Sequence, residues 1–383
     1  MSDRPRDRLL VVAGEASGDL AASAALGALR RLRGATPAVS AIGGAGVLPF
    51  AADTLADLRD LTAMGVGELA PRAAGLVRAF ARVRRLVVAR AFDAALLVGF
   101  SEFNTRLVPG LARAGIPVVF YGAPQVWAWR AGRMKQFAKM QGKLAVILPF
   151  EQGLWRSAGV DAHYVGHPAS EAALAPRSVV RQSLGLTPSA PAVAIMPGSR
   201  PHEVRALLPT FLAAYERARR DRATLDARVI VAPSLDRETA AWAIGLAREA
   251  HAPPVVVDAT TGATPLLPAF DVALTASGTA SLEAAIAGAV PVVAYRVGVV
   301  TELAARALVK VENIALPNIV LGRRVFAEHV QREVEPKLVA RSLNDAITRR
   351  APLGEACDAV RDKLGPERPS LAVARLVADV LDR

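Results

Sequence analysis

The sequence predicts an α/β protein of two doubly wound domains, and three observations lead to this class. Short apolar runs alternate with helical stretches rich in alanine and arginine, a pattern typical of βαβ units and parallel sheets. The 383 residues exceed what one hydrophobic core usually organises. The apolar runs also fall into two sets, separated by a polar stretch with proline and serine at residues 175–191. We therefore expect two domains of similar size that face each other across a cleft.

The expected strands and helices follow this alternation along the chain. Strands of the first domain are expected at residues 9–13, 94–98, 117–121 and 144–148. Strands of the second domain are expected at residues 192–196, 228–232, 255–257, 272–275 and 291–294. Helices are expected at residues 20–32 and 71–90 and from His202 onward. We place the domains at residues 1–170 and 171–345, with helices in residues 346–383 packing back on the first domain.

Composition and charge narrow the classes of partner. The formal net charge of +12 and the isoelectric point near 10.7 predict attraction to phosphorylated metabolites, an anionic lipid surface or nucleic acid. Nucleic acid ranks last, because the chain has no long basic tail, zinc-finger spacing or aromatic RNA-binding signature. Cys357 is the only cysteine, which excludes an intramolecular disulfide and a multi-thiolate metal site. With no spanning apolar run and no leader pattern, we expect a cytoplasmic protein that contacts a membrane only at its surface.

The expected helix at residues 71–90 has an unusual distribution of side chains. Its apolar stripe consists of Leu76, Val77, Phe80, Val83, Val87 and Val88. Its positive charges are Arg72, Arg78, Arg82, Arg84, Arg85 and Arg90. One interpretation is a helix that packs its stripe on the sheet with the arginines in water. The other is a basic amphipathic helix that lies in an anionic membrane surface, which the apolar loop residues just before it favour slightly.

The segment Gly14-Glu15-Ala16-Ser17-Gly18-Asp19 follows the first expected strand directly. The glycines permit a sharp turn and a close approach to the backbone, and Ser17 or Asp19 is suited to cap the next helix. The carboxyl ends of parallel strands are also where ligands bind in open sheets. Taken alone, the hexapeptide is equally compatible with a capped turn and with an active-site loop.

Two loops of the second domain have the residues of an anion site. Ser199 and Arg200 follow an expected strand and precede a helix, so a hydroxyl, free backbone N–H groups and a positive charge come together. Ser277, Gly278 and Thr279 likewise start a helix, and Glu283 lies one turn further on, where it is suited to accept ribose hydroxyls. Each loop alone is an ordinary helix start. Two in one domain favour a nucleotide diphosphate.

Tryptophan and arginine are concentrated in a third segment, residues 123–133. Gln125, Trp127, Trp129 and Arg130 are among its members. Aromatic faces stack on sugar rings and guanidinium groups pair with phosphate. A core position for one of the two tryptophans is the competing interpretation. His167, in the later segment 165–168, either orients a ligand or closes a turn.

Taken together and in order, these segments resemble the lipid A disaccharide synthase family. The resemblance extends over residues 9–340. It is carried by Gly14-Glu15-Ala16-Ser17-Gly18-Asp19, Gln125-Val126-Trp127-Ala128-Trp129-Arg130, Leu148-Pro149-Phe150-Glu151, Val165-Gly166-His167-Pro168, Pro197-Gly198-Ser199-Arg200, Ser277-Gly278-Thr279-Ala280-Ser281-Leu282-Glu283, Leu316-Pro317-Asn318, and Glu328 with Gln331. The combination is specific, although each motif alone is weak.

The resemblance implies a GT-B fold, in which the first domain holds the acceptor and the second holds UDP. The implied reaction joins UDP-2,3-diacylglucosamine to 2,3-diacylglucosamine 1-phosphate, with inversion and without a metal or other cofactor. Glu283, Asn318, Glu328 and Gln331 are then expected around the nucleotide, beside Ser199, Arg200, Ser277, Gly278 and Thr279. The expected acceptor-binding residues are Asn104, Gln125, Trp127 and Arg130. The resemblance also implies peripheral association with the inner face of the inner membrane and a homodimer.

The sequence departs from the family at one chemically important position. The family usually has Gly-Ile-Asp-x-Pro-Asp-Phe-Asn after the strand at residues 94–98, and its first aspartate is a favoured candidate for the general base. Alignment on Phe103-Asn104 puts Gly99 at that aspartate and Glu102 at the second one. The catalytic candidates in this chain are therefore Glu15, Ser17, Asp19 and Glu102. A smaller departure is Ala327, which replaces a proline before Glu328.

Three alternatives to the family reaction stay open at this point. Gly99 is compatible with a diverged member that uses a different lipid acceptor, or with a catalytically silent protein that binds UDP at a membrane surface. A related GT-B activity, such as UDP-N-acetylglucosamine epimerisation, is the third, and the segment rich in tryptophan and arginine speaks against it.

Overall fold

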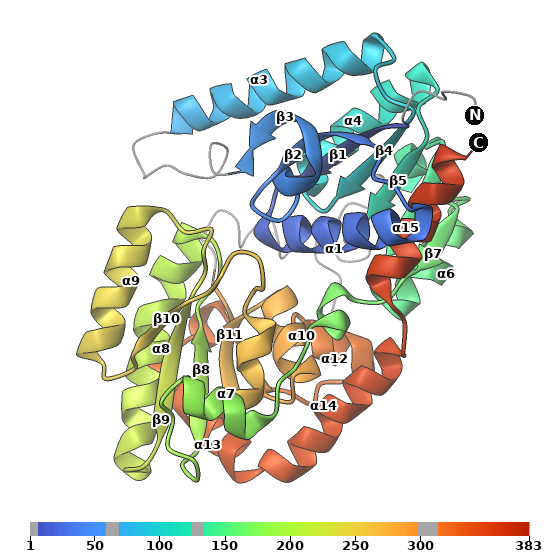
Figure 1. Cartoon of the computed structure of the whole chain (residues 1–383). Coiled ribbons are helices and arrows are strands. Elements are labelled where there is room, and N and C mark those ends of the chain that lie inside the picture. The colour runs from blue at the N-terminus through green and yellow to red at the C-terminus, as the bar shows by residue number, and fades with distance from the viewer. Residues whose placement is uncertain (1–6, 59–68, 125–133, 297–312, 383) are drawn as a thin grey trace. The chain divides into compact units, whose positions relative to one another are not determined.

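The structure, a computed structural model, describes residues 7–58, 69–124, 134–296 and 313–382. The chain divides into two compact units, one of residues 1–171 with 366–383 and one of residues 172–365 (Figure 1). This division falls one residue after the expected boundary. The expected C-terminal segment is itself divided, because α14 (Arg350–Leu364) belongs to the second unit and α15 (Pro369–Leu381) to the first.

The described strands of the first unit form one parallel sheet in the order β3-β2-β1-β4-β5-β6-β7. They are β1 (Arg8–Ala13), β2 (Ala38–Gly43), β3 (Ala51–Asp57), β4 (Ala94–Val98), β5 (Val118–Tyr121), β6 (Gly142–Val146) and β7 (Ala162–Tyr164). Valine, leucine and alanine fill β1 and β4 because both faces of a central parallel strand are covered.

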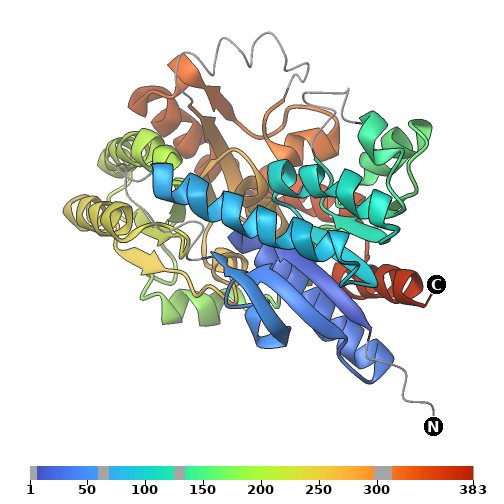
Figure 2. The same ribbon diagram turned by 90° about the horizontal axis from the view of Figure 1, so that it is seen from above.

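Helices cover the two faces of this sheet. On one face α1 (Ala16–Arg33) and α15 lie side by side and bury the alternate residues Leu9 and Val11 (Figure 1). On the other face α3 (Leu69–Val88) and α4 (Ser101–Ala114) cover Leu10 and Val12 (Figure 2). Shorter elements are η1 (Leu48–Phe50), α5 (Met134–Phe137), α6 (Pro149–Ser157) and η3 (Pro168–Glu171).

The second unit repeats this architecture around a parallel sheet of order β10-β9-β8-β11-β12-β13. Its strands are β8 (Ala192–Met196), β9 (Asp226–Val231), β10 (Pro254–Val256), β11 (Val272–Ala276), β12 (Val290–Tyr295) and β13 (Glu328–Val330). Its helices, besides α14, are α7 (Arg177–Ser183), α8 (Pro201–Asp221), α9 (Arg237–Glu249), η4 (Thr264–Ala269), α10 (Thr279–Ile286), α12 (Leu316–Leu321), η5 (Gln331–Glu333) and α13 (Pro336–Thr348). Helices α8 and α13 pack against each other, whereas α14 packs against α10 and α12.

Helix α3 agrees with parts of both interpretations of its sequence. Val83 and Val87 are buried in the core, and Leu76 and Phe80 pack against it, so most of the apolar stripe faces the sheet. Val77 and Val88, however, are 67% and 79% exposed. None of the described helices is long and apolar enough to cross a bilayer. The outer face of α3 therefore combines two exposed valines with arginines.

Candidate active site

Three loops of the first unit meet at the edge of the sheet where β1, β4 and β5 end. Each begins with a glycine: Gly14, Gly99 and Gly122. A Cβ atom on Gly14 would lie only 2.1 Å from the ring of Phe100, so the β4 loop crosses closely over the β1 loop. Gly99 and Phe100 both have positive φ angles, of 51° and 44°. The β4 loop is thus a left-handed turn, which is strained at the phenylalanine.

Glu15 is the carboxylate that this turn holds at the sheet edge. It occupies the N-cap position of α1 without a side-chain capping bond. Its Oε1 instead accepts a hydrogen bond from the backbone N–H of Phe100 at 3.1 Å. A Cβ atom built on Gly99 would lie 4.0 Å from the same oxygen. The Glu15 carboxylate therefore lies beside the position where the family pattern has its aspartate.

Ser17 and Asp19 do not cap α1, contrary to the sequence prediction. The helix already begins at Ala16, so both residues lie within its first turns, where Ser17 is exposed and Asp19 is buried. Asp19 accepts three hydrogen bonds from the loop after β2. Their donors are the backbone N–H groups of Gly44 at 2.6 Å, Gly46 at 2.8 Å and Val47 at 3.2 Å. The carboxylate of Asp19 thus anchors that loop to α1.

The two polar residues expected from α4 have contrasting positions. The Glu102 side chain is 57% exposed and pairs with Arg106 one turn later at 3.2 Å. Asn104 is completely buried, and its Nδ2 donates to the carbonyl oxygen of Gly99 at 2.8 Å. Through this hydrogen bond Asn104 supports the turn, while its Oδ1 is buried without a hydrogen-bond partner among the described residues. Its expected contact with an acceptor stays a prediction. The other expected acceptor residues, Gln125, Trp127 and Arg130, lie outside the described residues.

In the second unit, the loop between β8 and α8 presents Ser199 and Arg200 to solvent. Arg200 is the N-cap of α8, and its guanidinium lies 3.4 Å from the Glu203 carboxylate. Glu203 also accepts a hydrogen bond from the backbone N–H of Ser199 at 3.3 Å. Gly198 has a φ of 121°, and a Cβ there would lie 2.6 Å from a Glu203 oxygen. The loop therefore pairs one exposed cation with one acid at a helix N-terminus.

The loop between β11 and α10 adds a second helix start to the same sheet edge. Gly278, with a φ of 130°, is the N-cap, and Thr279 is exposed at the first helical position. Ser277 donates to the carbonyl oxygen of Ile314 at 2.9 Å. Burial raises the pKa of Glu283, and the Thr264 side chain offsets part of this rise through a hydrogen bond. Glu283 lies one turn into the helix, as the sequence predicts.

Asn318 and Glu328 form a buried network that ends on the backbone of residues 314–315. Glu328 accepts hydrogen bonds from the N–H groups of Ile314 at 3.1 Å and Ala315 at 3.0 Å. Asn318 donates to Glu328 at 2.7 Å, and its own oxygen accepts from the N–H groups of the loop before β13. Both side chains are almost fully buried. They therefore hold the loop that Ser277 also contacts, and their side chains have little surface for a nucleotide.

Two residues at this edge, Glu203 and Tyr295, were not singled out from the sequence. Tyr295 ends β12 next to Val330 of β13, and both are 36% exposed. Burial raises the pKa of Tyr295, the Glu203 charge adds to the rise, and the Arg200 charge opposes it. Glu203 and Tyr295 therefore belong to the Arg200 cluster, with Gln331 following Val330 at a φ of 53°. An aromatic residue just after an apolar run was the available signal for Tyr295.

Metal ligands do not gather at either edge among the described residues. Within those ranges, no three His, Cys, Asp or Glu side chains are placed to hold a metal ion together. Helix N-termini, hydroxyl groups and Arg200 are the groups at hand for an anion in the second unit.

The sequence family is decided by comparison with known proteins. The family model described as lipid-A-disaccharide synthetase matches residues 9–359. The chain belongs to this family. Relatives named lipid-A-disaccharide synthase are 38% identical in Anaeromyxobacter dehalogenans strain 2CP-1, over 99% of both chains, and 35% identical in Myxococcus xanthus, over 98% of this chain and 97% of the relative. As a member of the synthase family, the chain is a glycosyltransferase.

Solved structures similar to this member of the synthase family show the same fold with other activities. A putative UDP-N-acetylglucosamine 2-epimerase from Listeria monocytogenes matches with a TM-score of 0.64 at 10% identity, covering 98% of this chain and 96% of its own. Spinosyn forosaminyltransferase SpnP matches with a TM-score of 0.58 at 15% identity, covering 99% and 100%. The GT-B fold is thus confirmed, whereas membership of the synthase family distinguishes the activity from that of the epimerases.

Proposed function

We propose that the chain joins UDP-2,3-diacylglucosamine to 2,3-diacylglucosamine 1-phosphate, with Glu15 as the general base. The observation that carries the proposal is the Glu15 carboxylate, held by the Phe100 N–H group beside position 99. In this reaction the acceptor hydroxyl transfers its proton to Glu15. The oxygen of the acceptor hydroxyl bonds to the anomeric carbon of the donor. The bond from that carbon to UDP breaks at the same time, and the configuration at the carbon is inverted.

Glu15 is preferred over the other two acids because of their surroundings. Asp19 is engaged by three backbone N–H groups, and accepting a proton would weaken at least one of these bonds. Glu102 lies in solvent and pairs with Arg106, which leaves it no dry position from which to act. We assign Asp19 to holding the loop after β2, and Ser17, exposed next to Glu15, to contacting the acceptor.

On the donor side, we propose that Ser199, Arg200 and the N-terminus of α10 bind the diphosphate of UDP. Backbone N–H groups at Gly278 and Thr279 and the charge of Arg200 would stabilise the departing diphosphate. Arg200 lies 3.4 Å from the Glu203 carboxylate, and a phosphate would compete with that carboxylate for its guanidinium. Glu283 and Gln331 are proposed to contact the nucleoside, while Asn318 and Glu328 hold the loop at residues 314–315.

We also propose that the protein works at the inner face of the inner membrane. The acceptor and the donor both carry acyl chains, and the outer face of α3 exposes Val77 and Val88 among arginines. Gln125, Trp127 and Arg130 are proposed to bind the acceptor, as the family pattern implies. The same pattern implies a homodimer, which sedimentation equilibrium of the purified chain would measure.

The deciding experiment supplies the purified chain with both lipid substrates and measures UDP and disaccharide. We expect both products in equal amounts. UDP binding in calorimetry without turnover would support a silent nucleotide-binding protein and would overturn the transferase proposal. The same assay with UDP-N-acetylglucosamine alone should give no epimer.

A further inference from the structure

A cavity of about 220 Å³ lies in the second unit, at the start of β12. The candidate donor loops follow the carboxyl ends of the strands, whereas this cavity is beside their amino ends. The lining extends along β12 from Val290 to Val292, and Val292 lies three residues before Tyr295, which places the nearest part of the cavity roughly 10 Å from the donor edge. It also occupies a gap in the sheet, because β13 pairs with β12 only from Val293 onward. The cavity is therefore separate from the donor loops at Ser199, Arg200 and Gly278, although the backbone N–H groups of Val325 and Phe326 in its lining donate to Asn318.

Positively charged and apolar residues both line the cavity. Arg324 and Arg349 line it together with Asp345, and Val325 and Ala327 contribute partly exposed apolar side chains. Arg324 donates one hydrogen bond, to the carbonyl oxygen of Glu328 at 2.7 Å. Arg349 donates to Asp345 at 3.2 Å. Each guanidinium has five N–H donors, so both retain donors for a ligand, with a net charge of one positive unit.

A hydroxyl group adds a neutral donor to the same wall. Ser342 lines the cavity, and its oxygen lies 3.0 Å from Nε2 of His329. Burial lowers the pKa of His329, so the ring is neutral at pH 7. When Nε2 carries the hydrogen, the hydroxyl of Ser342 is available to donate to a bound anion.

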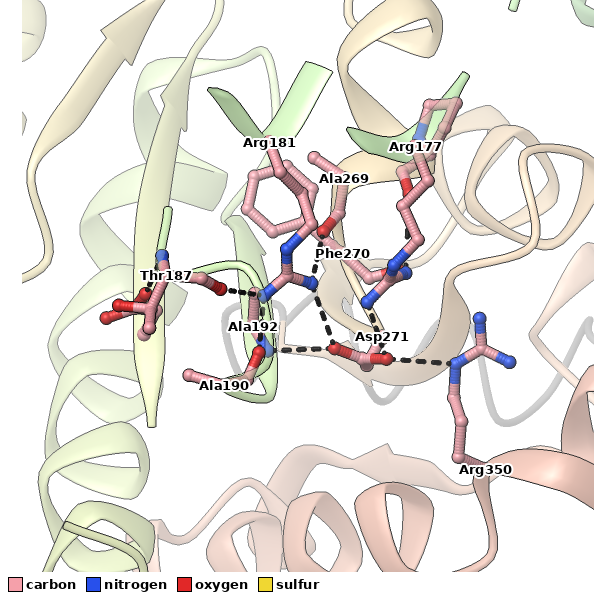
Figure 3. Close-up of polar contacts among 11 residues, drawn as sticks. Arg177, Arg181, Thr187, Ala190, Ala192, Ala269, Phe270, Asp271 and Arg350 are labelled. Atoms are coloured by element: carbon pink, nitrogen blue, oxygen red, sulfur yellow. Dashed lines mark hydrogen bonds and ion pairs between the residues drawn. The ribbon is translucent and has the colours of Figure 1, made fainter. Parts of the chain in front are cut away.

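Arg349 is held at the cavity by its neighbour in sequence. It lies between α13 and α14, and the next residue, Arg350, forms an ion pair with Asp271 at 3.3 Å. Figure 3 shows Arg177 and Arg181 converging on the same carboxylate, at 2.8 and 3.6 Å. Asp271 also accepts from the N–H of Ala192 at 2.9 Å, which ties this cluster to the sheet. The helix junction that presents Arg349 is thus fixed before any ligand arrives.

We propose that this cavity binds a small organic anion, whose phosphate or carboxylate head lies between Arg324 and Arg349 and whose apolar body rests on Val325 and Ala327. The site does not depend on the proposed transferase reaction. Its occupant is defined by a compact charged head and an apolar body small enough for the cavity.

The test measures binding of phenyl phosphate to the full chain by calorimetry, in the presence of saturating UDP to occupy the donor loops. Arg324→Ala and Arg349→Ala should each weaken binding at least tenfold. Arg323→Ala is the matched control, because it removes an exposed arginine from the same loop outside the cavity, and it should leave binding unchanged. Asp345→Asn should tighten binding severalfold, since it frees Arg349 from its acidic partner.

Further measurements identify the class of ligand and detect variants that fail to fold. Benzoate and phenyl phosphate separate a carboxylate head from a phosphate head. Inorganic phosphate should bind at least tenfold more weakly than phenyl phosphate, and equal affinity would mean an adventitious ion only. Equal binding by all arginine variants, or full displacement by UDP, would overturn the proposal. Thermal unfolding identifies any variant that fails to fold, and Asp345→Asn then decides, because a gain in affinity cannot come from unfolding.

Discussion

Single residues at the first sheet edge differ in what surrounds them more than in their chemistry. Glu15, Asp19 and Glu102 are all carboxylates near the ends of β1 and β4. Backbone N–H groups surround Asp19, and Arg106 accompanies Glu102 in solvent. Glu15 alone of the three contacts the Gly99-Phe100 turn. The role of each acid follows from the donors around it.

Glu15→Gln should reduce kcat by about 100-fold or more, because the amide has no basic oxygen to take the hydroxyl proton. The measurement is UDP release at saturating concentrations of both lipids. Glu102→Gln serves as the control and should stay within about threefold of the unmodified chain. A fully active Glu15→Gln protein would remove Glu15 from the proposed mechanism.

A carboxylate restored at position 99 should compensate for the loss of Glu15. Aspartate tolerates the left-handed conformation of Gly99 better than most residues, and its side chain would start 4.0 Å from the Glu15 oxygen. We expect Glu15→Gln with Gly99→Asp to be at least tenfold faster than Glu15→Gln alone. Glu15→Gln with Gly99→Asn has the same size without the charge and should give no gain. Equal rates for the two double variants would contradict the assignment.

The sequence predicted which polar residues gather at the two edges, but not which of them reach the surface. Asn104, Asn318 and Glu328 are buried and hydrogen-bonded to nearby backbone, and their expected ligand contacts stay predictions. A motif places a side chain at a strand end, yet its orientation depends on loops from other elements. Asp19 shows this clearly, because its partners lie in the loop after β2.

Elements with strong apolar runs were predictable, and those with weak ones were not. The expected strands at residues 9–13, 94–98 and 192–196 correspond to β1, β4 and β8. Strands β2 and β3 were missed because alanine, serine and aspartate interrupt their apolar pattern, and pairing within the sheet stabilises them, β2 beside β1 and β3 beside β2. The amphipathic helix α3 was expected, although its sequence could not show that Val77 and Val88 lie outside the buried stripe.

Helix α3 should carry the attraction to anionic lipid. Arg84→Glu with Arg85→Glu reverses two exposed charges, and we expect its binding to anionic vesicles to fall by roughly 30-fold or more. Co-sedimentation with vesicles measures the effect. The control Arg219→Glu with Arg220→Glu makes the same change of net charge on exposed positions of α8. Equal losses in both variants would assign the attraction to overall charge rather than to α3.

At the scale of the whole molecule, the chain passes between its two units twice, after Glu171 and before Pro366. Within the first unit, the segments next to these two points are bonded to each other. Glu171 accepts hydrogen bonds from the backbone N–H and the hydroxyl of Ser370, at 2.8 and 2.9 Å. Gly166 has a φ of 89°, and a Cβ there would lie 2.7 Å from Glu367. His167 follows it, fully enclosed, with Nδ1 accepting from the N–H of Ala169 at 3.2 Å. The histidine thus closes a turn where the chain leaves and re-enters the first unit.

The enclosed His167 should make the protein sensitive to acid. Burial lowers its pKa from 6.5 to about 4, so the unfolded chain takes up a proton at a higher pH than the folded chain does. Stability is therefore complete above pH 6.5 and is lost as the pH falls towards 4, by about 3 kcal/mol. Urea unfolding between pH 4 and 7 measures this loss. His167→Gln should flatten that part of the profile, and an unchanged slope would show that other groups cause it.

The position of α15 has a consequence for how the protein is made. Val373, Val377 and Val380 of this helix complete the core that α1 begins. Residues 172–365, which form the second unit, are synthesised after residues 1–171 and before α15. At a ribosomal rate of about 5–20 residues per second, this interval lasts roughly ten to forty seconds. The later, continuous unit can finish folding first, while the earlier one waits with an exposed apolar face. During translation, the α1 face of the first unit is thus the surface on which a chaperone would act.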